Sequence, residues 1–193
     1  MTANQNVRAE KEKSILDAAY KLFKNNGFHR VGVDLIISES QAAKQTVYNY
    51  FGSKEKIILL CITNEIENNK KRIVEATTQD EQMNMEKLKA LFEWHIQKNA
   101  RDNSTECLIT KAAVELWYIK EVQALITTYQ EWKYNLISEL LDQLRLCEAK
   151  RKILFAVLNT LSLPSLATNH KIEWKDIKNL IDQTDKTEIS VSG

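Results

Sequence analysis

Residues 44–55 read KQTVYNYFGSKE, and this stretch decides how the whole chain is interpreted. Its first seven residues can form a short helix that turns Val47 inward and polar side chains outward. Gly52 then interrupts the pattern, and Ser53 is a good N-cap for a long helix that starts at Lys54. A short, polar helix held between two breaks is what the recognition element of a helix-turn-helix requires. The stretch therefore predicts binding to duplex DNA.

The outward side chains of this segment are of the types that read DNA. Lysine donates to guanine acceptors, glutamine and asparagine can pair with adenine, and hydroxyl groups suit phosphate oxygens. A lysine in the first turn of the next helix adds charge where a helix N-terminus already favours an anion. Composition alone leaves open an ordinary solvated helix that binds no nucleic acid. The residues expected to contact DNA are Lys44, Gln45, Thr46, Tyr48, Asn49, Tyr50 and Lys54.

Working outward toward the N-terminus, two further helices complete a three-helix unit. Apolar residues recur at helical spacing over 15–23, and Gly27 follows as the natural left-handed cap of that helix. Residues 33–39 form a second short amphipathic segment. Residues 1–8 are polar, and we expect them to be disordered. The first helix would bury the back of the unit, and the second would cross the phosphate backbone.

Composition extends the helical prediction to the whole chain. Its 193 residues include only one proline and four glycines, and long amphipathic stretches dominate. Strands and tight turns need those two residues, so we predict an all-α fold. We assign residues 1–55 to a helix-turn-helix domain and residues 56–193 to a helical effector-binding and dimerisation domain. Residues 1–60 carry nine Lys or Arg and six Asp or Glu, a net +3, whereas the remainder carries −2. A basic head suits a phosphate partner.

Other classes of function find little support. The histidines at 29, 95 and 170 are scattered, and neither a glycine-rich phosphate loop nor metal-ligand spacing occurs. We therefore expect no enzyme activity, no metal and no cofactor. Apolar runs are too short to span a bilayer, and no charged-then-apolar leader opens the chain, so a cytoplasmic protein is expected. Three cysteines on apolar stretches, Cys61, Cys107 and Cys147, are expected to be buried, reduced thiols.

The N-terminal sequence resembles the DNA-binding domain of the TetR family of bacterial transcriptional repressors. The resemblance rests on residues 15–23 (ILDAAYKLF), Gly27-Phe28, residues 33–36 (VDLI) and residues 46–55 (TVYNYFGSKE). It runs over about residues 10–60 without a gap, and its closing motif is highly specific. It implies a homodimer, a palindromic operator, and a variable C-terminal domain that binds a small molecule and then releases DNA.

Carried over by position, the resemblance divides the expected DNA contacts into two kinds. Lys44, Gln45 and Asn49 fall where family members touch bases. Residues 46, 48 and 54 fall where they touch phosphates, and Tyr50 lies beside them.

The chain also departs from the family at two sites near the turn. Gln41 stands where the family usually has a glycine, and Ala43 stands where it usually has a capping residue. Each change costs on the order of 1 kcal/mol, unless Ser40 takes over the capping. Val31 and Gly32 replace hydroxyl residues that often reach phosphate, which weakens the expected contacts of the second helix.

The rest of the chain is expected to hold the effector pocket and the dimer face. Two long stretches, about 122–146 and 149–167, carry apolar residues on several faces, which suggests a four-helix bundle with a second copy. Leu158 is expected at that interface. Aromatic residues at helical spacing are consistent either with plain core packing or with a mostly apolar pocket. The residues expected to border the pocket are Ile66, Trp94, His95, Ile109, Ala113 and Trp117.

One alternative stays open on the sequence alone. The protein could bind DNA without an effector and be controlled by a partner protein or by its own abundance. A solidly packed C-terminal domain would favour that alternative. The sequence names neither the effector, nor the operator, nor whether the protein represses or activates.

Overall fold

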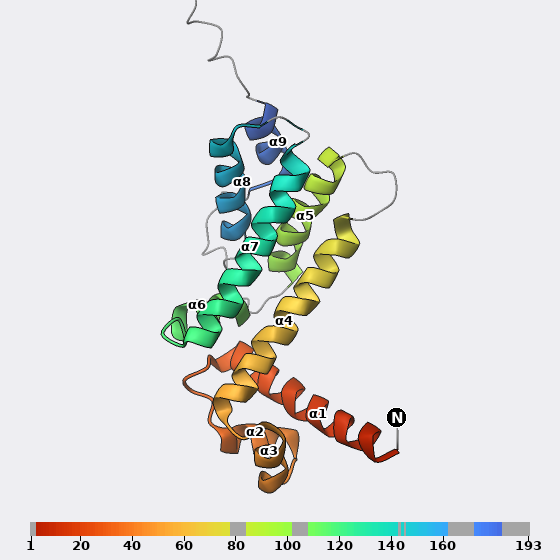
Figure 1. Cartoon of the computed structure of the whole chain (residues 1–193), viewed down its shortest axis with the longest axis vertical. Coiled ribbons are helices and arrows are strands. Elements are labelled where there is room, and N and C mark those ends of the chain that lie inside the picture. Colours follow the sequence, from red (N-terminus) through yellow and green to blue (C-terminus); the bar gives the residue numbers. More distant parts are fainter. Residues whose placement is uncertain are drawn as a thin grey trace, which may run out of the picture. The chain divides into compact units, whose positions relative to one another are not determined.

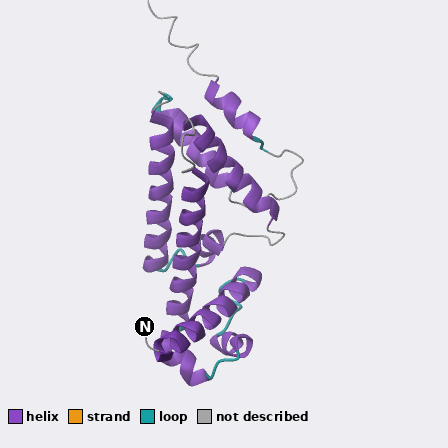
Figure 2. Ribbon diagram, turned by 90° about the vertical axis from the view of Figure 1, so that its right-hand side faces the viewer, coloured by secondary structure: helices purple, strands orange, loops and turns teal. Residues whose placement is uncertain are grey.

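The computed structural model describes residues 3–77, 84–101, 108–142, 144, 146–161 and 172–182. Within these ranges every regular element is a helix and none is a strand (Figures 1 and 2), which confirms the predicted all-α class. The helices are α1 (Ala3–Asn26), α2 (Val33–Ser40), α3 (Lys44–Phe51), α4 (Lys54–Thr77), α5 (Asn84–Arg101), α6 (Leu108–Glu115), α7 (Lys120–Asp142), α8 (Glu148–Thr160) and α9 (Trp174–Asp182).

The chain divides into two compact units, and two of the three boundaries fall inside α4 and α7. The first, here called the head unit, comprises Met1–Asn69 and Glu106–Tyr129. The second, the body unit, comprises Lys70–Thr105 and Gln130–Gly193. The head unit therefore includes α6 and the start of α7 as well as the predicted helix-turn-helix.

The head unit is held by one apolar face of α1. Ile15, Ala19 and Phe23 are each at most 1 % exposed, and the Phe23 ring lies 5.0 Å from the Phe28 ring. In Figure 1, α2 and α3 lie together at the lower end of α4. Ile36 of α2, Val47 and Phe51 of α3, and Ile57, Ile58 and Ile62 of α4 are also buried.

The first helix begins earlier than the sequence suggests. We expected residues 1–8 to be disordered, but α1 starts at Ala3. A side-chain hydrogen bond supports this N-terminal part of the helix, since Arg8 Nε donates to Glu12 Oε1 over 3.1 Å. Such a pair at i, i+4 supports an exposed helix. The polar composition of this stretch marks a solvated helix surface.

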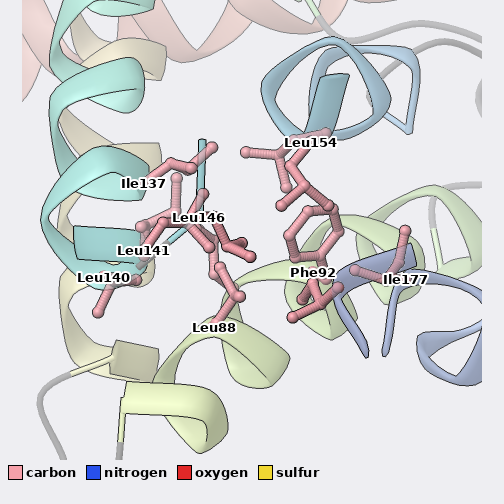
Figure 3. Close-up of a cluster of buried hydrophobic side chains, with 12 residues drawn as sticks. Leu88, Phe92, Ile137, Leu140, Leu141, Leu146, Leu154 and Ile177 are labelled. Atoms are coloured by element: carbon pink, nitrogen blue, oxygen red, sulfur yellow. The ribbon is translucent and has the colours of Figure 1, made fainter. Parts of the chain in front are cut away.

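The body unit has its own apolar core (Figure 3). Twelve buried side chains from six segments form it: Ile73, Leu88, Leu91, Phe92, Ile137, Leu140, Leu141, Leu146, Leu154, Leu158, Ile177 and Ile181. The apolar stripe of α9 faces α5, where the Trp174 ring lies 6.2 Å from that of Phe92. Leu158 is fully buried in this core, so its prediction as an interface residue was wrong. Part of the apolar surplus of α7 and α8 is core packing within one chain.

Helix α7 ends at Asp142, before the expected end near residue 146, and α8 is described to Thr160. Cys107, which we expected to be buried, lies outside the described residues. Within the described ranges, no helix combines the length and the apolar character needed to cross a membrane.

The two described cysteines differ in their surroundings. Cys61 is 1 % exposed, and burial, with a smaller contribution from the nearby Asp17 carboxylate, raises the pKa of its thiol to about 12. Cys147 is exposed, so the prediction that it is buried was wrong: it stands at the N-cap of α8, outside the apolar stripe.

This difference predicts selective alkylation. Because the thiolate is the nucleophile, Cys61 should resist iodoacetamide at pH 8 in the folded protein, while Cys147 should react. Peptide mass mapping of the labelled protein checks this, with urea-unfolded protein as the control in which both react. Equal labelling of the two cysteines in the folded protein would contradict the burial of Cys61.

Candidate nucleic-acid interface

Helix α3 presents a polar face above a buried anchor. Val47 and Phe51 are 1 % and 6 % exposed, and they fasten one side of the helix. Lys44, Gln45 and Asn49 are exposed on the other side. Tyr48 is 43 % exposed, and residues 46, 50 and 54 are half-buried. The structure thus brings all seven predicted DNA-binding residues together on α3 and the first turn of α4.

The turn before α3 carries the predicted departures. Gln41 has φ 53° and ψ 24°, a left-handed conformation that glycine adopts at lower cost. Ala43 occupies the N-cap position without a side-chain hydrogen bond. Ser40 does not take over this role, because its hydroxyl donates to the Ile37 carbonyl over 3.3 Å. The N-terminal end of α3 therefore lacks a side-chain cap.

The start of α4 is capped as the sequence predicts. The Lys56 N–H donates to Ser53 Oγ over 3.3 Å. The pKa of Glu55 lies below its usual value because its carboxylate accepts hydrogen bonds from its own backbone N–H and from the Ser53 hydroxyl. These acceptors occupy part of the helix N-terminus, where Lys54 adds the positive charge expected to meet a phosphate.

Lys44 has a partner on α2. Its Nζ lies 3.3 Å from Asp34 Oδ1, and the two side chains are 66 % and 85 % exposed. An ion pair this exposed contributes little to stability, and a base or phosphate can displace it. Asp34 nevertheless holds the amine near the outward face of α3 before any ligand arrives.

Tyr50 is also held from another helix. The Arg8 guanidinium lies over its ring, 5.0 Å from the centroid, and the ring meets that of Phe51 edge-on at 6.3 Å. Arg8 and Asp34 were not among the predicted site residues. Neither has a local sequence signal, because each acts on a helix 10 or more positions away.

Helix α6 is fastened to the end of α1 by two side chains, here called the α6 clasp (Lys111 and Glu115). Glu115 Oε2 accepts the backbone N–H groups of Phe28 and His29 over 2.8 and 3.2 Å. The Lys111 ammonium donates to the Lys24 carbonyl over 2.7 Å. Free carbonyls at a helix C-terminus favour a cation, and successive backbone N–H groups favour an anion. In the clasp, Lys111 supplies the cation and Glu115 supplies the anion.

The residues expected to border an effector pocket are distributed over both units. In the head unit, Ile66 and Ile109 are buried, Ala113 is half-buried and Trp117 is 46 % exposed. In the body unit, Trp94 is half-buried, and His95 is buried with its ring 4.6 Å from that of Trp94. His95 Nδ1 lies 2.9 Å from the Leu91 carbonyl, which places the ring proton on Nδ1 as the donor. Their role as a pocket stays a prediction.

Among the residues that the structure describes, no group of three or more His, Cys, Asp or Glu side chains is placed to hold a metal ion. The chemistry available on the surface of α3 is hydrogen bonding and charge.

Residues 15–61 match the profile of bacterial regulatory proteins of the tetR family. The matched region contains the second half of α1, all of α2 and α3, and the first turns of α4. The N-terminal region of the chain therefore carries a TetR-family DNA-binding domain. No curated protein sequence matches the chain.

Solved structures of bacterial proteins share the fold over most of this chain. A TetR transcriptional regulator from Legionella pneumophila has 15 % identity and a TM-score of 0.72, covering 91 % of this chain and 97 % of its own. Reduced NemR of E. coli has 16 % identity and a TM-score of 0.71, with coverages of 90 % and 94 %. The fatty acid degradation regulator FadR of Bacillus halodurans has 22 % identity and a TM-score of 0.65, with coverages of 89 % and 93 %.

Proposed function

We propose that this TetR-family regulator is a repressor that binds a palindromic operator as a homodimer and is released by a small-molecule effector. The observation that carries the DNA-binding part is the exposed polar face of α3 above the buried anchor of Val47 and Phe51. A rigidly held polar helix of this size suits the major groove.

The proposed contacts divide according to side-chain chemistry. Lys44, Gln45 and Asn49 would read base edges, because they are exposed and can donate or accept in pairs. Thr46, Tyr48 and Lys54 would bind phosphates and set the register without selecting sequence.

The proposed dimer uses α7 and α8, as the sequence suggests. Ile153 of α8 is 48 % exposed in a single chain, and it supplies apolar surface that a second copy would cover. Two-fold symmetry of the protein would then match the two-fold symmetry of a palindrome. Half-sites would lie about one helical turn, roughly 34 Å, apart.

The alternative to release by an effector is a regulator that binds DNA without any ligand and is controlled by a partner protein or by its own abundance. A thermal-shift screen of small molecules decides between them, followed by operator release with His95→Ala and Trp117→Ala variants. An effector that acts normally on both variants would place its site away from the predicted residues. For an effector to lower the affinity for DNA 100-fold, its binding free energy must favour the DNA-incompetent state by about 2.7 kcal/mol.

Selection from random duplex DNA tests the central proposal. The purified full-length protein should enrich one palindrome with two equal half-sites. If no palindrome is enriched, the proposed function is wrong.

Replacing Gln45 by alanine should relax sequence preference at one base pair of each half-site. The loss of discrimination should be about 1–3 kcal/mol per position, because a bidentate pair to a base is removed. Competition binding with single-base variants of the selected operator measures it. Unchanged preference at every position would remove Gln45 from the reading face.

Replacing Lys54 by alanine should weaken binding to all DNA about equally. It should also reduce the dependence of affinity on salt by about one phosphate contact per subunit. Titrations between 50 and 200 mM salt, about the range over which such slopes are measured, give the result. An unchanged slope would argue against a phosphate contact, and Gln45→Ala serves as the control that leaves the slope intact.

A further inference from the structure

The recognition helix has little support at its own ends. Helix α3 is eight residues long, which is too short to be stable by itself in water. Its N-cap, Ala43, provides no side-chain hydrogen bond, and the strained Gln41 precedes it. The orientation of α3 must therefore come from contacts with other helices.

The buried anchor restrains α3 along one line only. Val47 and Phe51 are four residues apart, so they lie about 40° apart around the helix axis. Two anchors that are nearly in line hold the helix down but leave it able to roll. A roll would move Gln45 and Asn49 relative to the base edges. Tyr50 lies about 100° around the axis from Phe51, so a contact there resists rolling.

Arg8 supplies a contact at that position. Its guanidinium lies 5.0 Å from the centre of the Tyr50 ring, and Glu12 Oε1 accepts its Nε–H over 3.1 Å. The carboxylate thus orients the guanidinium, and the guanidinium faces the aromatic ring, an arrangement that attracts electrostatically. The early start of α1 at Ala3 places Arg8 in a regular helix.

We propose that Arg8 is a positioning residue for DNA recognition, because it braces the C-terminal turn of α3 through the ring of Tyr50. This inference rests on the proposed function, in which α3 reads the operator. It assigns Tyr50 a role through its ring, in place of a hydroxyl contact to phosphate. A direct contact of Arg8 with a phosphate is the competing explanation, and it differs in its salt dependence.

The experiment compares four variants of the full-length protein with the wild type: Arg8→Ala, Tyr50→Leu, Tyr50→Phe and the double variant Arg8→Ala/Tyr50→Leu. Lys11→Ala is the matched control, because it removes one exposed positive charge from the same helix. Affinity for the selected palindrome is measured at several salt concentrations. Hydrogen exchange of the peptide that covers residues 44–51 is measured without DNA.

A brace predicts a specific pattern. Arg8→Ala and Tyr50→Leu should each lower operator affinity roughly tenfold, since a contact is lost in each of two subunits. The double variant should be no weaker than either single one, because both remove the same contact. Tyr50→Phe, which keeps the ring, should lose less affinity than Tyr50→Leu. The salt dependence of Arg8→Ala should match that of the wild type, and its 44–51 amides should exchange faster than those of Lys11→Ala.

Three results would overturn the inference. In the first, the affinity losses of the two single variants multiply in the double variant, and the salt dependence of Arg8→Ala is shallower than that of the wild type. Arg8 would then be a phosphate ligand. Another is a loss with Tyr50→Phe as large as with Tyr50→Leu. The third is unchanged exchange of residues 44–51 in Arg8→Ala. Because this last measurement uses no DNA, it decides on the brace even if the wild type selects no palindrome and the proposed function fails.

Discussion

Replacing Gly27 by alanine is expected to lower the free energy of unfolding by about 2–4 kcal/mol. Gly27 has φ +79°, where a side chain costs on the order of 1 kcal/mol. A Cβ atom there would stand 2.6 Å from Glu115 Oε1. The flexible carboxylate can rotate away, but it then loses the N–H groups of Phe28 and His29, and charge-assisted bonds of this kind contribute about 1.5–3 kcal/mol.

The other described glycines provide matched controls for this result. Gly52 has φ +73°, and no atom of the described residues packed around it would come within 4 Å of an added Cβ. Gly52→Ala should therefore cost only the backbone term of about 1 kcal/mol. Gly32 has φ −85° and open space, so Gly32→Ala should change stability by less than about 1 kcal/mol. Urea unfolding measures all three variants.

A double variant separates the two causes at Gly27. In a Glu115→Ala background, Gly27→Ala should cost only the backbone term of about 1 kcal/mol, because no carboxylate remains to be displaced. If Gly27→Ala and Gly52→Ala are equally destabilising in the wild-type background, the α6 clasp does not contribute at this position.

Replacing Leu158 by glutamate is expected to unfold the protein. Leu158 is fully buried in the body core, so the variant loses its apolar contacts and also buries an unpaired carboxylate. Large-to-small changes in a core alone cost about 2–5 kcal/mol, and whole domains are stable by about 5–15 kcal/mol. Circular dichroism and thermal melting should show loss of cooperative folding.

Ile153→Glu is the matched control on the same helix. This side chain is already 48 % exposed, so the charge can remain hydrated and the chain should stay folded. If α8 forms the proposed dimer face, sedimentation should show folded monomers for this variant. A folded Leu158→Glu protein would contradict the core assignment, and a fully dimeric Ile153→Glu protein would remove Ile153 from the interface.

Local patterns were sufficient for much of the candidate site. The left-handed Gly27 and the Ser53 cap each act within a few residues, so the sequence alone locates the C-terminal end of α1 and the start of α4. The outward placement of Lys44, Gln45 and Asn49 follows from the inward placement of Val47, because helical spacing allows only one face to be buried.

Burial of single residues was less predictable from the same patterns. Leu158 and Cys147 both lie in apolar stretches, yet the first is in the core and the second is exposed at a helix cap. Periodicity indicates that a helix has an apolar face but does not say which surface covers it. A neighbouring helix of the same chain and a second copy leave the same pattern in the sequence.

By itself, the sequence determined the helical class, the three-helix head and the exposed polar face of α3, because these depend on interactions between residues close together in the chain. Only the tertiary structure decided how α3 and α6 are held. Arg8 meets Tyr50 across 42 positions, and Glu115 meets Phe28 across 87. A ring face or the end of a helix can bind any exposed Arg or Glu side chain that comes close enough. Which of them does so depends on the packing of the helices in space.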